Sequence, residues 1–167
     1  MNLDSRLSNR LAQFVDQHHR LRRAAGVLAH SGDSPFWVAG LLLMLWRGSP
    51  AWQFESKVDL IGIGLTALAA QIIKWSVRRP RPAGEWGQGY RKLDPHSFPS
   101  GHAARAFVLA TVALFLGPLW WAILLVAWAP LVALARVAMR VHYLSDVIVG
   151  ALCGLTCGIG LGLWISF

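Results

Sequence analysis

The sequence predicts an all-α fold: a polytopic transmembrane helix bundle of about five spans, preceded by an amphipathic interfacial helix. Hydrophobic residues make up 55% of the chain and charged residues only 14%, whereas soluble proteins average about 25% charged residues. Several long apolar stretches alternate with short polar segments, a pattern typical of membrane-spanning helices. The nine tryptophans agree with this fold, because Trp concentrates at membrane interfaces. The length of 167 residues indicates a single domain.

The N-terminal segment has the periodicity of an amphipathic helix over residues 5–24. Its apolar face would carry Leu7, Leu11, Phe14 and Leu21. We expect an interfacial helix within residues 1–30, because burying each of its charges near the membrane centre would cost about 2.5–3.5 kcal/mol. The alternatives are a soluble helix packed on the bundle and a sixth span. No cleavable signal peptide is expected, because the segment is highly charged and lacks an apolar core.

Five apolar stretches follow this segment. They are residues 36–46, 58–73, 101–116, 119–139 and 143–167. The first is short for a span of about 20 residues and needs its flanks to cross the membrane. Residues 47–57 are expected to form a polar connection, and residues 74–100 a long functional loop.

The last apolar stretch carries a glycine at every fourth position. These are Gly150, Gly154, Gly158 and Gly162. Residues spaced by four share a helix face, so the pattern predicts close packing against another helix. The only cysteines, Cys153 and Cys157, lie in the same stretch and are expected to be buried and inert.

Three polar segments flank these stretches and contain the residues suited to phosphate chemistry. They are Lys74-x6-Arg81-Pro82, Pro99-Ser100-Gly101-His102 and Arg136-x5-His142-x3-Asp146. If the spans alternate in direction, all three segments lie at the same membrane face. The sequence therefore predicts one composite site.

The cations of these segments match the needs of phosphoryl transfer, which depends on positioning and on stabilising charge on the phosphoryl oxygens. Lys74, Arg81 and Arg136 are the candidate phosphate ligands, although any one of them alone could instead meet a lipid headgroup. Six other cations are expected to remain at headgroups or to attract an anionic substrate. They are Arg78, Arg79, Arg91, Lys92, Arg105 and Arg140.

The remaining residues of the segments can supply a nucleophile and a proton donor. His142 and Asp146 are four residues apart, so a carboxylate could orient the imidazole on one helix face. Ser100 and Gly101 would begin a helix whose N–H groups attract an anion, with Ser100 as its cap. His102 could protonate a leaving alkoxide. The other histidines, His18, His19, His30 and His96, are expected to be solvated or interfacial.

The combined pattern resembles the signature of the phosphatidic acid phosphatase type 2 family, whose superfamily also includes vanadium haloperoxidases. The match covers Lys74 to Asp146, and Ala135 stands where the family usually has Ser before the Arg. The resemblance implies that His142 attacks phosphorus, Asp146 orients it and His102 protonates the leaving group. Lys74, Arg81, Ser100, Gly101 and Arg136 would hold the phosphoryl oxygens. No metal or other cofactor is implied.

We therefore expect a lipid phosphatase or diphosphatase acting through a phosphohistidine on a phosphorylated lipid such as phosphatidylglycerophosphate or a polyprenyl diphosphate. The net charge of +8 fits phosphate and anionic headgroups better than nucleic acid, given the apolar stretches. The alternative function is a non-enzymatic membrane transporter or lipid-binding subunit; the membrane spans argue against a soluble haloperoxidase.

Location is expected in the inner cell membrane, in contact with membrane lipids. The Lys and Arg residues on the active-site face favour the cytoplasmic side. Bacterial members of the family usually place the site outside, and phosphate-binding cations distort the charge count. We expect the extracytoplasmic face for these reasons. The sequence gives no oligomeric state.

Overall fold

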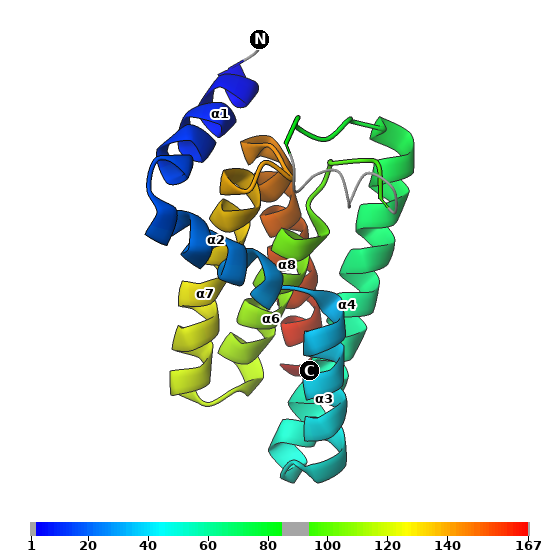
Figure 1. Ribbon diagram of the computed structural model, residues 1–167. Coiled ribbons are helices and arrows are strands. Elements are labelled where there is room, and N and C mark those ends of the chain that lie inside the picture. The colour runs from blue at the N-terminus through cyan, green and yellow to red at the C-terminus, as the bar shows by residue number, and fades with distance from the viewer. Residues whose placement is uncertain (1–2, 85–93, 167) are drawn as a thin grey trace.

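A computed structural model describes residues 3–84 and 94–166 as a helical protein with the active-site segments gathered at one end (Figure 1). Its helices are α1 (Leu3–Asp16), α2 (His19–Ser31), α3 (Ser34–Arg47), α4 (Pro50–Val77), α6 (Gly101–Leu116), α7 (Leu119–Ala138) and α8 (Leu144–Ser166). The expected all-α bundle is confirmed.

Three helices within the described residues are long and apolar enough to cross a membrane: α4, α7 and α8. The apolar helices α3 and α6 are shorter, with 14 and 16 residues. At 1.5 Å per residue they extend about 21 and 24 Å, less than the roughly 30 Å of a hydrocarbon core. All five expected apolar helices are present, but two reach across the membrane only with their flanking residues.

The polar connection expected at residues 47–57 is much shorter in the structure, so this prediction was wrong. Helix α4 already begins at Pro50, and only Gly48 and Ser49 separate it from α3. Proline at the first helical position has no N–H to leave unpaired, so it favours a helix start there. The polar side chains of this segment therefore belong to a long helix and not to a loop.

The N-terminal segment is two helices rather than the single one expected. Helix α1 ends at Asp16, and α2 begins at His19 after a break at Gln17 and His18. Small or short side chains face the bundle, including Ser8 and Ala12, while Phe14 is 55% exposed. An exposed apolar side beside charged residues is the pattern of a helix lying in the membrane interface.

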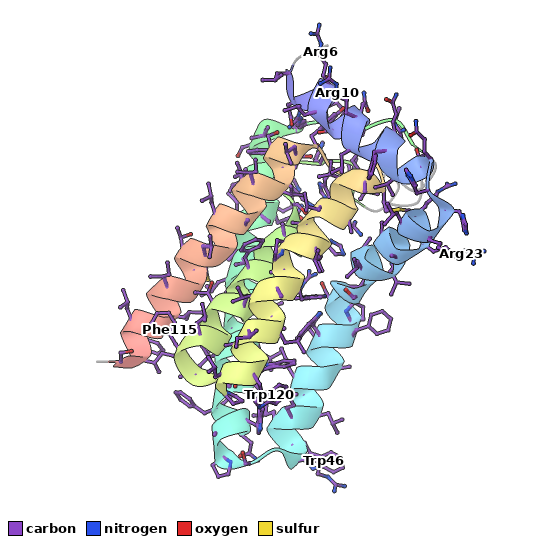
Figure 2. The ribbon with its side chains drawn as sticks, turned by 90° about the vertical axis from the view of Figure 1, so that its left-hand side faces the viewer. Arg6, Arg10, Arg23, Trp46, Phe115 and Trp120 are labelled. Carbon is purple, nitrogen blue, oxygen red and sulfur yellow. The ribbon has the colours of Figure 1, made fainter. Side chains whose placement is uncertain are left out.

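The two ends of the molecule differ in the side chains they present. Arg6, Arg10 and Arg23 lie at the end formed by α1 and α2, whereas Trp46 and Trp120 lie at the opposite end (Figure 2). Both groups are types that concentrate at membrane interfaces. The long axis of the bundle is therefore the direction in which it crosses the membrane.

Helix α6 lies at the centre of the bundle, against α4, α7 and α8. The predicted glycine face of α8 packs on it along its whole length. A Cβ added at Gly150 would overlap the carbonyl oxygen of Ser100, and one at Gly158 would overlap Thr111. The close packing expected from the glycine pattern is confirmed, and it sets the separation between Ser100 and the start of α8.

Candidate active site

The structure brings the three polar segments together at the end of the bundle that carries α1. Lys74 lies in the last turn of α4, and Arg136 in the last turn of α7. Ser100 caps α6, accepting a hydrogen bond at Oγ from the N–H of Ala103 over 3.4 Å. Asp146 lies in the first turn of α8. Helix ends from four parts of the chain thus build one site.

Most of the predicted residues line a single cavity of about 170 Å³. They are Lys74, Arg81, Gly101, His102, Arg136 and His142. The two others, Ser100 and Asp146, are fully buried beside it. A cavity walled by two histidines and three cations can bind a phosphoryl group and present a nucleophile to it.

Asp94, which the sequence did not single out, lies between two of these cations. Its Oδ2 accepts hydrogen bonds from Lys74 Nζ and from Arg81 Nη2, the latter over 2.9 Å. Its carbonyl oxygen accepts a further bond from Arg81 Nε over 2.8 Å. The carboxylate therefore engages the groups that a phosphate would need. Nothing in the sequence indicated this role, because Asp94 lies 20 positions after Lys74 and belongs to none of the three motifs.

This arrangement predicts that Asp94→Asn will strengthen phosphate binding. The amide keeps the size of the side chain but removes the negative charge that competes for Lys74 and Arg81. We expect the inhibition constant of inorganic phosphate to fall about three- to tenfold, the scale of one partly exposed charge interaction. Asp16→Asn, which neutralises an exposed carboxylate on α1, is the control. An unchanged or higher constant for Asp94→Asn would contradict the prediction.

His142 lies in the turn before α8 and is held by the segment that precedes α6. Its Nδ1 donates to the carbonyl oxygen of Ser97 over 2.7 Å, and lies 3.5 Å from Oδ2 of Asp146. Its Nε2 lies 3.3 Å from Arg81 Nη1. The proton on Nδ1 leaves the lone pair of Nε2 directed toward a phosphate-binding cation, which is the tautomer needed for attack.

The environment of His142 keeps its imidazole neutral. Complete burial lowers the pKa of His142 well below its usual value, and the positive charges of Arg136 and Arg81 lower it further. A neutral imidazole is the nucleophilic form.

Asp146 stabilises the turn that carries His142. Its Oδ2 accepts from the N–H of Tyr143 over 2.8 Å, and its Oδ1 from Arg79 Nη1 over 2.7 Å. Its carbonyl oxygen accepts from the N–H of Ser100 over 2.9 Å, which ties the second motif to the third. The orientation of His142 by Asp146 stays a prediction, and the structure adds the Ser97 carbonyl as the nearer partner.

His102 has a carboxylate partner that the sequence did not indicate. Its Nε2 lies 2.7 Å from Oδ1 of Asp33, in the connection between α2 and α3. The hydrogen bond with His102 is the main cause that lowers the pKa of Asp33 to about 2, and the bond with His30 adds to it. Asp33 is therefore ionised at neutral pH, and its negative charge partly offsets the burial and the positive charges of Arg136 and Arg105, which disfavour protonation of His102. His30, expected to be solvated, lies 2.9 Å from Asp33 Oδ2.

Two cations expected at lipid headgroups lie elsewhere. Arg79 contacts Asp146 and also Asp4 of α1, whose Oδ2 lies 2.6 Å from its Nη2. Arg105 is only 8% exposed and lines the active-site cavity. The headgroup position expected for Arg79 is wrong because the distant carboxylates of Asp4 and Asp146 bind its guanidinium. Arg105 lies where it could attract an anionic substrate, which is the other role expected for it. Arg91 and Lys92 lie outside the described residues.

Ala135, the departure from the family signature, packs in an apolar cluster with Ala25 and Ala29 of α2. It is 4% exposed. The position thus contributes to the packing of α2 on α7.

Fold and site together define a class: a membrane helix bundle with a cavity that can bind a phosphoryl group. The model of the PAP2 superfamily matches residues 59–167. The chain belongs to this superfamily, as the motifs had predicted.

Two relatives of this chain are named as phosphatases. The chain is 32% identical over 121 residues to a lipid A 1-phosphatase of Porphyromonas gingivalis, covering 71% of this chain but only 25% of that protein. It is 33% identical over 149 residues to a decaprenylphosphoryl-5-phosphoribose phosphatase of Mycobacterium tuberculosis, covering 87% of this chain and 80% of the relative. The crystal structure of Aquifex aeolicus LpxE superposes with a TM-score of 0.77 at 26% identity, covering 96% of this chain and 95% of that one.

Proposed function

We propose that the protein removes a phosphate from a membrane lipid through a covalent phosphohistidine on His142. The observation that carries this proposal is the cavity in which His142 and His102 meet Lys74, Arg81 and Arg136. Phosphoryl transfer requires this combination of a nucleophile, a proton donor and fixed cations.

The first step is attack of His142 Nε2 on phosphorus. Arg81 Nη1, now 3.3 Å from Nε2, would turn its hydrogen bond to a phosphoryl oxygen as the substrate enters. Lys74 and Arg136 would bind the remaining oxygens and offset the charge that develops on them. The Ser97 carbonyl stabilises the proton on Nδ1 as His142 becomes positively charged.

His102 supplies the proton for the departing lipid oxygen. With Nε2 bonded to Asp33, the proton that it transfers would come from Nδ1. The P–O bond breaks as this proton moves, so a neutral lipid alcohol, or a lipid monophosphate when the substrate is a diphosphate, is released. The neutral His102 then takes a proton from water, whose oxygen attacks the phosphohistidine and returns His142 and inorganic phosphate.

The shape of the cavity supports a lipid as the substrate. Below the cations its wall continues along α4 through Ile63, Ala67 and Ala70, toward the middle of the bundle. A phosphate held by Lys74 would therefore be followed by apolar surface at membrane depth. Thr66 and Gln71 are the polar side chains on that stretch of the wall, so a soluble sugar phosphate would find few partners there.

Phosphate release by the purified full chain, with EDTA present, tests the proposal. The substrates are phosphatidylglycerophosphate, phosphatidic acid, undecaprenyl diphosphate, lipid A 1-phosphate and decaprenylphosphoryl-5-phosphoribose. We expect release from at least one lipid, abolished in His142→Ala. A folded protein that binds these lipids but releases no phosphate would instead support a transporter or lipid-binding subunit.

Because the pKa of His142 is lowered, we expect kcat/KM to stay constant as the pH falls toward 6.5. Falling pH would inactivate the enzyme by protonating Nε2, and because the pKa is lowered this loss occurs well below pH 6.5. The profile of kcat/KM reports the free enzyme. In Arg81→Gln, which removes one of the positive charges beside His142, the acid limb should move toward higher pH. Both proteins are assayed with the same substrate, so any ionisation of the substrate affects the two pH profiles equally. A limb that stays in place or moves to lower pH would contradict the prediction.

We further propose that the active-site end faces the extracytoplasmic side of the inner membrane. Helix α8 runs from the site to the opposite end of the bundle, so residues after Ser166 would then be cytoplasmic. A green fluorescent protein fused after Phe167 should fluoresce in bacterial cells, and alkaline phosphatase fused there should be inactive. The reverse pattern would place the site in the cytoplasm.

A further inference from the structure

A second cavity, of about 260 Å³, runs along α3 and α4 toward the end opposite the active site. Its lining includes Trp37, Trp52 and Trp121 together with two carboxylates, Glu55 and Asp59. Glu55 lies next to Gly117, in the turn between α6 and α7. This turn is one helix length away from His102, whereas the other end of the cavity, at Ser31 and Trp37, approaches the α2–α3 connection that contains Asp33.

The carboxylates are buried although they stand in a membrane-spanning helix. Glu55 is 2% exposed and Asp59 is 3% exposed. Glu55 Oε1, Ser56 Oγ and Asp59 Oδ1 have no hydrogen-bond partner among the described residues. Polar atoms buried without partners are costly, and charged residues at membrane depth usually mark a binding site or ion path. The three atoms line one cavity, so a single cationic ligand could satisfy them together.

Aromatic side chains make the cavity suited to an organic cation. Trp37 and Trp121 lie with ring centroids 6.3 Å apart, and Trp52 and Trp121 6.0 Å apart. Indole faces attract ammonium groups, most strongly where water is excluded. A bare metal ion needs more oxygen donors, and no cluster of three or more metal-binding side chains exists within residues 3–84 and 94–166.

We propose that this cavity binds the ammonium group of a membrane lipid with a primary-amine headgroup. The ammonium would lie between Glu55 and Asp59, which offsets the repulsion of two carboxylates one helical turn apart. Arg47, exposed at the end of α3, lies at the same end of the bundle and would meet the lipid phosphate. The exposed residues of α3 along the cavity would contact the acyl chains.

Native mass spectrometry of the delipidated full chain tests this site without reference to phosphatase activity. The protein is titrated with phosphatidylethanolamine and with phosphatidylglycerol of the same acyl chains. We expect a dissociation constant about tenfold or more lower for phosphatidylethanolamine, and equal constants in the double variant Glu55→Gln/Asp59→Asn. Trp52→Leu, which leaves both carboxylates in place, should lose part of the preference.

Asp16→Asn is the matched control, since it removes an exposed carboxylate far from the cavity. Equal binding of the two lipids by the wild type would overturn the proposal. So would a preference that survives in the double variant, or one that Asp16→Asn abolishes equally. The neutral amides have the size of the carboxylates they replace, and an unchanged thermal melting temperature of the double variant in detergent would show that it is folded.

Discussion

Replacing His142 with alanine is expected to lower kcat/KM by at least roughly a thousandfold, because the nucleophile is lost while the cations remain. The change also removes the acceptor of the covalent phosphate. Rapid quenching of the wild type with a ³²P-labelled lipid should trap a phosphoprotein that is stable in base and labile in acid, the behaviour of phosphohistidine. The variant should give no such species.

His19→Ala is the matched control for this loss, since His19 is exposed at the start of α2. It should retain the activity and the labelling of the wild type. Thermal melting in detergent establishes whether each variant is folded, which matters because His142 is buried. A folded His142→Ala protein that still forms the base-stable phosphoprotein would exclude His142 as the nucleophile.

Replacing His102 with alanine is expected to give a loss that depends on the leaving group. For an unactivated lipid alkoxide we expect about a 10²–10⁴-fold fall in kcat/KM, the usual contribution of a general acid. For p-nitrophenyl phosphate, whose leaving group departs without protonation, the fall should be at least tenfold smaller. Parallel assays of the two substrates measure this ratio.

The ratio separates proton donation from a merely structural role of His102. A distorted cavity would slow both substrates alike, and equal losses would therefore contradict the assignment. Asp33→Asn provides a graded companion variant, because it removes the charge that favours protonated His102 but keeps the side-chain size. Its loss should have the same dependence on the leaving group at a smaller magnitude, whereas Asp16→Asn should show neither.

The features predicted from sequence are those encoded within one helix or one motif. Glycines spaced by four on α8 determine a close helix contact wherever the partner lies, so this packing could be predicted without knowing that α6 is the partner. The signature from Lys74 to Asp146 likewise identified the groups that line the cavity. Alternation of apolar stretches was enough to place their ends at one membrane face.

The residues that sequence missed act through tertiary contacts. Asp33 lies 69 positions before His102 and belongs to a connection that resembles an ordinary turn. Asp94 comes from a proline-rich loop, and Ser97 acts through its carbonyl oxygen, which no residue type specifies. The N-terminal segment was predicted as one helix because its apolar periodicity nearly continues through Gln17 and His18. Both α1 and α2 pack against α7, so the chain contacts the bundle on each side of the break.

The glycine contact between α6 and α8 restricts how this protein can move. Backbones that touch along several turns cannot slide or separate without opening voids, so the two helices behave as one rigid body. That body carries Ser100, His102 and Asp146, whose mutual distances are therefore preserved through every catalytic cycle. Any rearrangement that admits a lipid from the bilayer must fall on the other side of the cavity, where α4, Asp94 and the α2–α3 connection meet it. The proton donor and the carboxylate beside the nucleophile thus lie on the immobile half of the molecule, and substrate exchange is left to the half that carries Lys74.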